Sequence, residues 1–222
     1  MPASIVLCGA SGHARVVADI VRLAGEYEII GFLDDRDPGR KGTLFLGAPI
    51  LGGREALAGL RNRGVRHLLL AFGDGAARLR AGAVAREAGL ILATAVHPRA
   101  VVAADVVVGP GTVVMAGAVV NPGTRLGESV IVNTCASIDH DCDIGDGAHV
   151  CPGAHLAGTV RVGRAAWVGI GAAVIDGVHI GDGAFIGAGS AVVSDIPDGM
   201  LAYGVPARVV RRWRPNGGSV TA

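Results

Sequence analysis

The residues of this chain with the clearest chemical potential lie in one stretch, residues 133–145, which reads NTCASIDHDCDIG. His140 has an aspartate on either side, and imidazole is the side chain that can take and return a proton near neutral pH. We therefore treat His140 as a candidate general base. Asp141 could hold or tune the imidazole, although adjacent side chains on an extended segment normally diverge.

The stretch around His140 is part of a six-residue repeat that runs from Val96 to Pro197 without an insertion. Val, Leu or Ile fills the first position of all seventeen hexads, the fifth position is nearly as regular, and glycine recurs in the second. One hexad holds a short strand and a turn, so three hexads close a triangular coil and residues 18 apart stack about one strand spacing, ~4.8 Å, above each other. Gly158 lies 18 residues after His140, which predicts a bare backbone N–H, suited to an oxyanion, beside the base.

The first third of the chain has a different pattern, in which buried strands alternate with helices. Residues 4–8 form an apolar run, residues 9–13 read GASGH, and residues 14–24 have apolar side chains at helical spacing. A strand over 28–33 that ends in Asp34-Asp35 is followed by a strand over 44–51, a helix over 54–62, a strand over 66–72 and a helix over 75–87. This alternation predicts a small parallel sheet with helices around it.

The glycine-rich turn before the first predicted helix is a candidate anion site, because backbone N–H groups at a helix N-terminus would face the ligand. It matches neither GxGxxG nor a phosphate-binding loop with GK[ST], so a tight turn without a ligand is an equal alternative. Asp34 and Asp35 could accept hydrogen bonds from a ribose or sugar hydroxyl, or belong to a solvated loop. The predicted division is an α/β domain over 1–94, a repeat domain over 95–197 and a C-terminal extension and tail over 198–222.

Composition excludes several classes of function. The net charge of +1 argues against a nucleic-acid partner or an anionic membrane held by bulk electrostatics. The apolar run 100–120 is interrupted by Asp105, Pro110 and glycines, and the hexads account for its apolar positions, so no membrane span is expected. Four cysteines without CxxC spacing and the absence of a signal-peptide profile predict reduced thiols in a cytoplasmic protein. No ligand geometry follows from the positions of His140, His149 and His155, so no metal is expected.

The motifs together resemble a known family. GASGH near the N-terminus, a strand ending in two aspartates, and N-x-x-x-x-I-[ED]-H-[ED]-C-x-I-G are similar to the hexapeptide-repeat sugar acyltransferases, over nearly the whole chain from Ile5 to about Arg211. The branch contains sialic-acid O-acetyltransferases and N-acetyltransferases of nucleotide-linked 4-amino sugars, such as those of the bacillosamine and perosamine pathways. The resemblance implies a small Rossmann-like α/β N-terminal domain followed by a left-handed parallel β-helix. It also implies a homotrimer with acetyl-CoA bound as co-substrate between adjacent β-helices.

The resemblance assigns roles residue by residue. The implied catalytic residues are the base His140, its acidic neighbour Asp141, and Gly158 as the oxyanion donor. The residues implied to contact acetyl-CoA are His149, Ile170, Ala188, Pro206 and Arg208, where Ala188 stands at a position that relatives fill with glycine. The residues implied to bind the nucleotide sugar are Gly12, His13, Ala14, Asp34, Asp35 and Gly52, where Ala14 replaces a frequent glycine.

Four functions remain open from the sequence. The favoured one is acetyl-CoA-dependent N-acetylation of a UDP-, GDP- or dTDP-linked 4-amino-deoxysugar, because a dedicated nucleotide-site domain suits an activated sugar. O-acetylation of a sugar or sialic acid would use the same base. A non-catalytic β-helix trimer scaffold conflicts with the intact set of His140, His149 and Gly158, and a nucleotide-sensing module would leave the CoA-like features unexplained.

Overall fold

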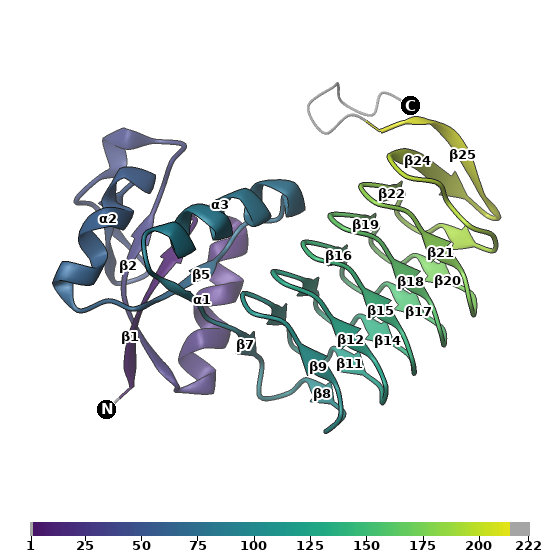
Figure 1. The fold of residues 1–222 in the computed structure, drawn as a ribbon, viewed down its shortest axis with the longest axis horizontal. Helices are drawn as coiled ribbons and strands as arrows, with labels where there is room; N and C mark the ends of the chain where they lie inside the picture. Colours follow the sequence, from purple (N-terminus) through teal and green to yellow (C-terminus); the bar gives the residue numbers. More distant parts are fainter. Residues whose placement is uncertain (1, 214–222) are drawn as a thin grey trace.

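A computed structural model describes residues 2–213, and its N-terminal part is a sheet covered by helices on both faces (Figure 1). The sheet order is β3-β4-β2-β1-β5-β6, and every neighbouring pair is parallel except β3 and β4. Its strands are β1 (Ala3–Cys8), β2 (Tyr27–Leu33), β3 (Leu44–Phe45), β4 (Ala48–Gly52), β5 (His67–Leu70) and β6 (Ile91–Leu92). Apolar side chains of α1 (Gly12–Ala24) pack on one face of the sheet, and those of α2 (Leu57–Leu60) and α3 (Gly75–Glu87) pack on the other.

Two predicted elements of this part differ from the structure. The single strand expected over 44–51 is a hairpin, because Leu46 and Gly47 both adopt positive φ and reverse the chain. The helix expected over 54–62 is broken into three short helices, η2 (Arg54–Ala56), α2 and η3 (Arg61–Arg63). One further short helix, η1 (Pro38–Arg40), follows β2. No helix within residues 2–213 is long and apolar enough to cross a bilayer.

The repeat builds a triangular prism whose three sides are parallel sheets of two-residue strands. Sheet I contains β7 (Ala95–Val96), β10 (Val113–Val114), β13 (Ile131–Val132), β16 (His149–Val150), β19 (Trp167–Val168) and β22 (Phe185–Ile186). Sheet II contains β8 (Val101–Val102), β11 (Val119–Val120), β14 (Ser137–Ile138), β17 (His155–Leu156), β20 (Ala173–Val174) and β23 (Ala191–Val192). Sheet III contains β9 (Val107–Val108), β12 (Arg125–Leu126), β15 (Asp143–Ile144), β18 (Arg161–Val162) and β21 (His179–Ile180).

The predicted 18-residue period is present in the strand register. Ser137 pairs with His155 and His155 with Ala173, each 18 residues apart, and the same offset holds in the other two sheets. The second residue of each strand points into the prism and forms one aliphatic core. The spacing shortens to 16 in the last coil, where Ile180 pairs with Ile196 and Phe185 with Leu201. Sheet I then ends in an antiparallel hairpin of β24 (Met200–Gly204) and β25 (Ala207–Arg212); residues 214–222 of the expected tail lie outside the described residues.

The α/β part sits directly on sheet I of the β-helix. Val113, Met115 and Ile131 of the β-helix share one apolar cluster with the buried face of α1. Arg78 of α3 is only 1 % exposed, and its guanidinium donates hydrogen bonds to the carbonyls of Ser129 (3.0 Å) and Gly147 (2.8 Å) at the edge between sheets III and I. A buried cation held by backbone carbonyls fixes the two parts against each other, since breaking the contact would leave the charge without partners.

Candidate active site

His140 lies on the turn between β14 and β15, at the edge where sheets II and III meet. Its Nδ1 is 2.9 Å from Asp141 Oδ2. A carboxylate can only accept a hydrogen bond, so Nδ1 carries the proton and Nε2 is left free to accept one. The expected divergence of these neighbouring side chains is wrong, because Asp141 has φ of 57° and turns its side chain back to the ring.

The surroundings of His140 favour its charged form. The hydrogen bond that His140 Nδ1 donates to Asp141 and the negative charges of Asp139, Asp141 and Asp176 raise the pKa of His140, against a smaller opposing effect of desolvation. Asp139 accepts hydrogen bonds from the His140 backbone N–H and from Asn121 Nδ2, both at 2.8 Å, and these two bonds lower the pKa of Asp139. The imidazole is 56 % exposed, so a partner molecule can reach it. These features make the ring a stronger base than an isolated histidine.

Gly158 lies against the imidazole, as the 18-residue period predicts. A Cβ on Gly158 would lie 2.6 Å from both Cε1 and Nε2 of His140, so only glycine leaves the ring its place. The neighbouring Thr159 N–H donates to His140 O at 2.9 Å. Among the described residues the Gly158 N–H has no acceptor, so an unpaired donor lies beside the imidazole, which is the arrangement that stabilisation of an oxyanion requires.

His149, nine residues further on, lies in an opposite environment. It is 4 % exposed beneath the α/β part. Its Nε2 is 2.9 Å from Asn133 Nδ2, an amide donor, and its Nδ1 is 3.4 Å from Gly73 O, an acceptor. Desolvation, with the nearby Arg78 charge, lowers the pKa of His149 to about 3. The ring is therefore neutral, and both of its nitrogens face groups of the protein itself, so its predicted contact with acetyl-CoA stays a prediction.

His13 joins the His149 pocket from the start of α1. The two imidazole centroids are 6.2 Å apart, and burial followed by the Arg78 charge lowers the pKa of His13 to about 4. Its buried Nε2 has no hydrogen-bond partner among the described residues. Trp167 also packs against His149, with ring centroids 4.3 Å apart and the ring planes tilted by 59°. His13 therefore offers one uncommitted polar atom next to the His149 ring and near the Arg78 charge.

The two aspartates after β2 line a second cavity, of about 180 Å³, together with Gly52. Asp34 is 8 % exposed and pairs with Arg40 at 2.6 Å, while Asp35 accepts from the backbone N–H of Arg54 at 2.6 Å and from its Nε at 3.1 Å. Arg40 also donates to Ala10 O at 3.0 Å, which ties this cavity to the glycine-rich turn before α1. Gly12 and Ala14 lie in the first turn of α1. Sequence reasoning missed the two arginines, because nothing in their local sequence separates them from a solvated charged loop.

The remaining CoA candidates lie elsewhere on the β-helix. Ile170, 59 % exposed, and Ala188 occupy adjacent coils at the edge between sheets I and II, where Gly189 N–H donates to Ile170 O at 2.8 Å. Pro206 and Arg208 lie at the β24–β25 hairpin. The structure thus brings Ile170 next to Ala188 and Pro206 next to Arg208, but neither pair adjoins His140 along its edge of the prism.

One chain therefore does not assemble all the candidates. The α/β part covers sheet I and touches the edge between sheets III and I, whereas His140 lies on the edge opposite sheet I. The reason is geometric: His140 and His149 are nine residues apart, which is half of an 18-residue coil. The nucleotide-site candidates with His149 and the catalytic candidates with Gly158 thus occupy opposite sides of the prism.

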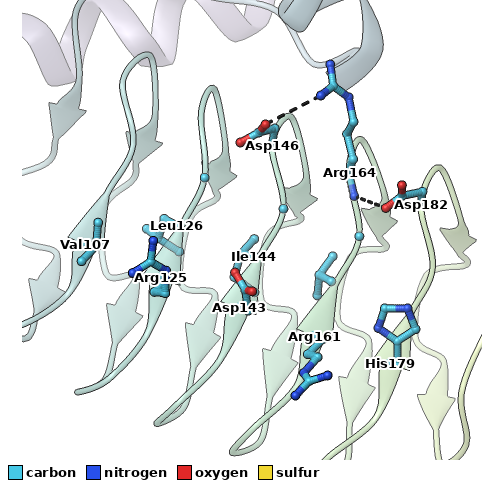
Figure 2. Close-up of a pocket in the computed structure, with 14 residues that line it drawn as sticks. Val107, Arg125, Leu126, Asp143, Ile144, Asp146, Arg161, Arg164, His179 and Asp182 are labelled. Atoms are coloured by element: carbon cyan, nitrogen blue, oxygen red, sulfur yellow. Dashed lines mark hydrogen bonds and ion pairs between the residues drawn. The ribbon is translucent and has the colours of Figure 1, made fainter.

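A larger open cavity, of about 510 Å³, runs along sheet III (Figure 2). Its floor carries a ladder of polar side chains, one from each successive coil: Arg125, Asp143, Arg161 and His179. At its rim, the Arg164 guanidinium lies 3.7 Å from the Asp146 carboxylate. The backbone N–H of Arg164 donates a hydrogen bond to Asp182 Oδ1 at 2.7 Å. His140 does not line this cavity. The cavity is therefore not taken as the active site, although it is larger than the one beside Asp34 and Asp35.

Comparison with known proteins finds a matching family model and several similar solved structures. The model of the PglD N-terminal domain family matches residues 4–82. PerB from Caulobacter crescentus, solved with CoA and GDP-perosamine, is 42 % identical, with a TM-score of 0.89 over 93 % of this chain and 97 % of that one. A variant of that perosamine N-acetyltransferase, with one histidine replaced by asparagine, matches at 42 % identity and a TM-score of 0.89, over 93 % of this chain and 96 % of that one.

The acetyltransferase domain of PglB from Neisseria gonorrhoeae, solved with acetyl coenzyme A, is similar over the full length as well. It is 38 % identical, with a TM-score of 0.87 over 95 % of this chain and 100 % of that one. The expected fold, a small Rossmann-like α/β domain followed by a left-handed parallel β-helix, is confirmed. This chain therefore belongs to the hexapeptide-repeat sugar acyltransferases, an enzyme family, in the branch of the perosamine and bacillosamine N-acetyltransferases.

Proposed function

We propose that this protein transfers the acetyl group of acetyl-CoA to the amino group of a nucleotide-linked 4-amino-deoxysugar. The observation that carries the proposal is His140, held at Nδ1 by Asp141 and lying over the bare backbone of Gly158. The chain is 42 % identical to an enzyme solved with CoA and GDP-perosamine, which supports this class of substrate pair.

The geometry suits direct attack on the thioester. The amine nitrogen bonds to the acetyl carbonyl carbon while His140 Nε2 takes its proton. The Gly158 N–H donates to the carbonyl oxygen as it becomes an oxyanion. The C–S bond then breaks and coenzyme A leaves as the thiolate, which takes the proton from His140. Positioning of two bound substrates supplies much of the remaining rate enhancement, and no covalent enzyme intermediate is required.

The charges around His140 favour nitrogen over oxygen as the acceptor. Asp139, Asp141 and Asp176 place negative charge around the ring. The amino group of the sugar is an ammonium at neutral pH and is attracted to this edge, although the nucleotide diphosphate makes the whole substrate an anion, whereas the carboxylate of sialic acid is repelled. O-acetylation remains the second candidate, because His140 can deprotonate a hydroxyl in the same way.

The separated candidates point to a homotrimer with each active site shared between two subunits. The outward residues of sheet II are small or apolar apart from His155, whereas those of sheet III are mostly charged. Sheet II is therefore the side suited to face other copies, which would bring the His140 edge of one subunit beside the α/β part of the next. Four free cysteines and the acetyl-CoA requirement fit a cytoplasmic location.

Substrate screening tests the reaction. Thiol release from acetyl-CoA would be measured with UDP-, GDP- and dTDP-linked 4-amino sugars and with sialic acid, and each product analysed by mass and NMR for an amide or an ester. We expect an amide on one of the nucleotide sugars. Ester formation on sialic acid, without turnover of any amine, would replace the proposal with O-acetylation.

Subunit mixing tests the shared site. A His140→Ala variant and an Asp34→Ala/Asp35→Ala variant, each inactive alone, would be unfolded together and refolded at equal concentrations. If a site takes His140 from one subunit and the aspartates from the next, about a quarter of the sites regain a complete set. A site contained within one chain predicts no recovery at all.

A further inference from the structure

Asp176 stands on the same edge of the prism as His140, two coils further along. The register between these coils has no slip: Ser137, His155 and Ala173 pair in sheet II, and Asp143, Arg161 and His179 pair in sheet III. The edge residues therefore stack in the order His140, Gly158, Asp176. The Cα atoms of His140 and Asp176 are about 10 Å apart, twice the strand spacing.

Gly158, between His140 and Asp176 on this edge, contributes no side chain, and the imidazole occupies the place of its Cβ. The imidazole leans over Gly158, with Nε2 and Cε1 next to the position that a Cβ would occupy. The ring thus extends over the Gly158 coil, which lies between His140 and Asp176, and its uncommitted Nε2 is one of the two ring atoms nearest to Gly158. Asp176 is close enough for its charge to raise the pKa of His140, as do the charges of Asp139 and Asp141.

Asp176 differs from the other two aspartates in having no partner of its own. Asp139 Oδ1 accepts from Asn121 and from the His140 N–H, and Asp141 Oδ2 faces His140 Nδ1. The Asp176 side chain is exposed, and it is absent from the side-chain hydrogen bonds and ion pairs found within residues 2–213. An exposed carboxylate on the same edge as His140, separated from it by a bare glycine, can accept hydrogen bonds from the ammonium group of an acceptor.

We propose that Asp176 binds the ammonium form of the acceptor sugar and makes the site selective for an amine over a hydroxyl. This inference rests on the proposed function, since it concerns the acceptor of the same site. The bound ammonium gives one proton to water through His140 and becomes the free amine. The nitrogen then bonds to the acetyl carbon, the C–S bond breaks, and the second proton passes through His140 to the thiolate, so that the overall reaction releases one proton.

The test compares two isoelectronic substitutions and two ligands. Asp176→Asn removes the proposed ammonium ligand, while Asp143→Asn removes the same charge from the outward face of sheet III, three residues from His140 (Figure 2). The ligands are the nucleotide-linked 4-amino sugar, measured by KM, and its 4-hydroxy counterpart, measured as a competitive inhibitor. Thermal unfolding checks that both variants fold.

We expect Asp176→Asn to raise KM for the amine about tenfold, as the loss of one hydrogen bond to a charged group predicts, with a smaller change in kcat. The inhibition constant of the hydroxy analogue should not change, Asp176→Glu should restore part of the affinity, and Asp143→Asn should behave as the wild type. Equal effects of Asp176→Asn and Asp143→Asn, or equal losses for both ligands, would overturn the inference while leaving N-acetylation intact. A wild-type protein that acetylates only hydroxyls would overturn both.

Discussion

His140 and His149 come from the same repeat and are nine residues apart, yet the fold gives them opposite properties. His140 is 56 % exposed, faces three aspartates, and has its pKa raised, with the Asp141 hydrogen bond as the largest cause. His149 is 4 % exposed beneath the Gly73 loop, and its pKa is lowered to about 3 mainly by desolvation. Nine residues are half a coil, so one ring lies on an open edge and the other on the covered side.

The difference shows that the hexad itself does not decide what a histidine does. The backbone geometry of the coil repeats, and only the surroundings of the two histidines differ. His140 is surrounded by water and carboxylates, whereas His149 is covered by the α/β part and lies near the Arg78 cation. A histidine keeps a useful affinity for protons where it is solvated and paired with carboxylates. Where it is buried near a cation, it is a neutral hydrogen-bonding group.

Removal of the base should produce the largest change. His140→Ala is expected to lower kcat about 10²- to 10⁴-fold, the usual contribution of a general base, and to leave the unfolding midpoint unchanged because the ring is exposed. Steady-state kinetics at saturating substrates and thermal unfolding would measure both. His179→Ala, an exposed histidine on sheet III, is the matched control. Near-normal turnover by His140→Ala would show that His140 is not the general base, so its exposed, carboxylate-rich environment would not distinguish it functionally from His149.

Removal of the cation above His149 should produce the next largest effect. Arg78→Met keeps the bulk of the side chain but deprives the Ser129 and Gly147 carbonyls of their donor, at a cost of about 3 kcal/mol in unfolding free energy. Denaturant unfolding would measure this loss. Arg80→Met, on an exposed position of the same helix, should change stability by less than about 0.5 kcal/mol. Equal effects at the two positions would show that Arg78 does not hold the parts together.

Acid should lower the free energy of unfolding through His13 and His149, the two histidines at the contact between the α/β part and sheet I. His13 and His149 have folded-state pKa values of about 4 and about 3, below the 6.5 of an unfolded histidine, so the unfolded chain binds more protons below that pH. Stability therefore falls as pH drops, by about 1 kcal/mol for each histidine between pH 7 and 5.5. Urea unfolding at both pH values would show the loss, and His149→Gln should reduce it.

His140 provides the control for the acid experiment. Its folded-state pKa is raised, so its contribution to stability is fully present at low pH and is lost as pH rises through that pKa. His140→Ala should therefore leave the acid-induced loss of stability in place. A flatter profile for His140→Ala than for His149→Gln would contradict the assigned environments.

The smallest expected effect concerns the partner of the base. Asp141→Asn removes the hydrogen bond that does most to raise the pKa of His140, so the acid limb of the kcat/KM profile should move to lower pH. The maximal rate should fall about tenfold, because the ring loses its orientation and some basicity. A pH–rate profile measures both changes, with Asp143→Asn as the charge-matched control. An unshifted limb would mean that Asp141 does not act on His140.

The repeat made much of the site predictable. An 18-residue coil places Gly158 beside His140, and the structure has that contact, because parallel pairing without a slip leaves no other neighbour. The approach of Asp141 was not predictable, since it depends on a left-handed backbone at a corner that glycine usually fills. The shortening of the last coil to 16 residues was also missed, because Val192 still fits the hexad while the chain after it pairs out of step.

The sequence by itself determined the coil, the two-part architecture and the stacking of His140 on Gly158, because each follows from local periodicity and from short strand-and-turn units. Only the tertiary structure decided which sides of the prism are covered. Arg78 looks like any other arginine on α3 until docking buries it against the Ser129 and Gly147 carbonyls. Burial and charge then set the properties of His140 and His149, and both depend on residues distant in sequence, which no periodic pattern encodes.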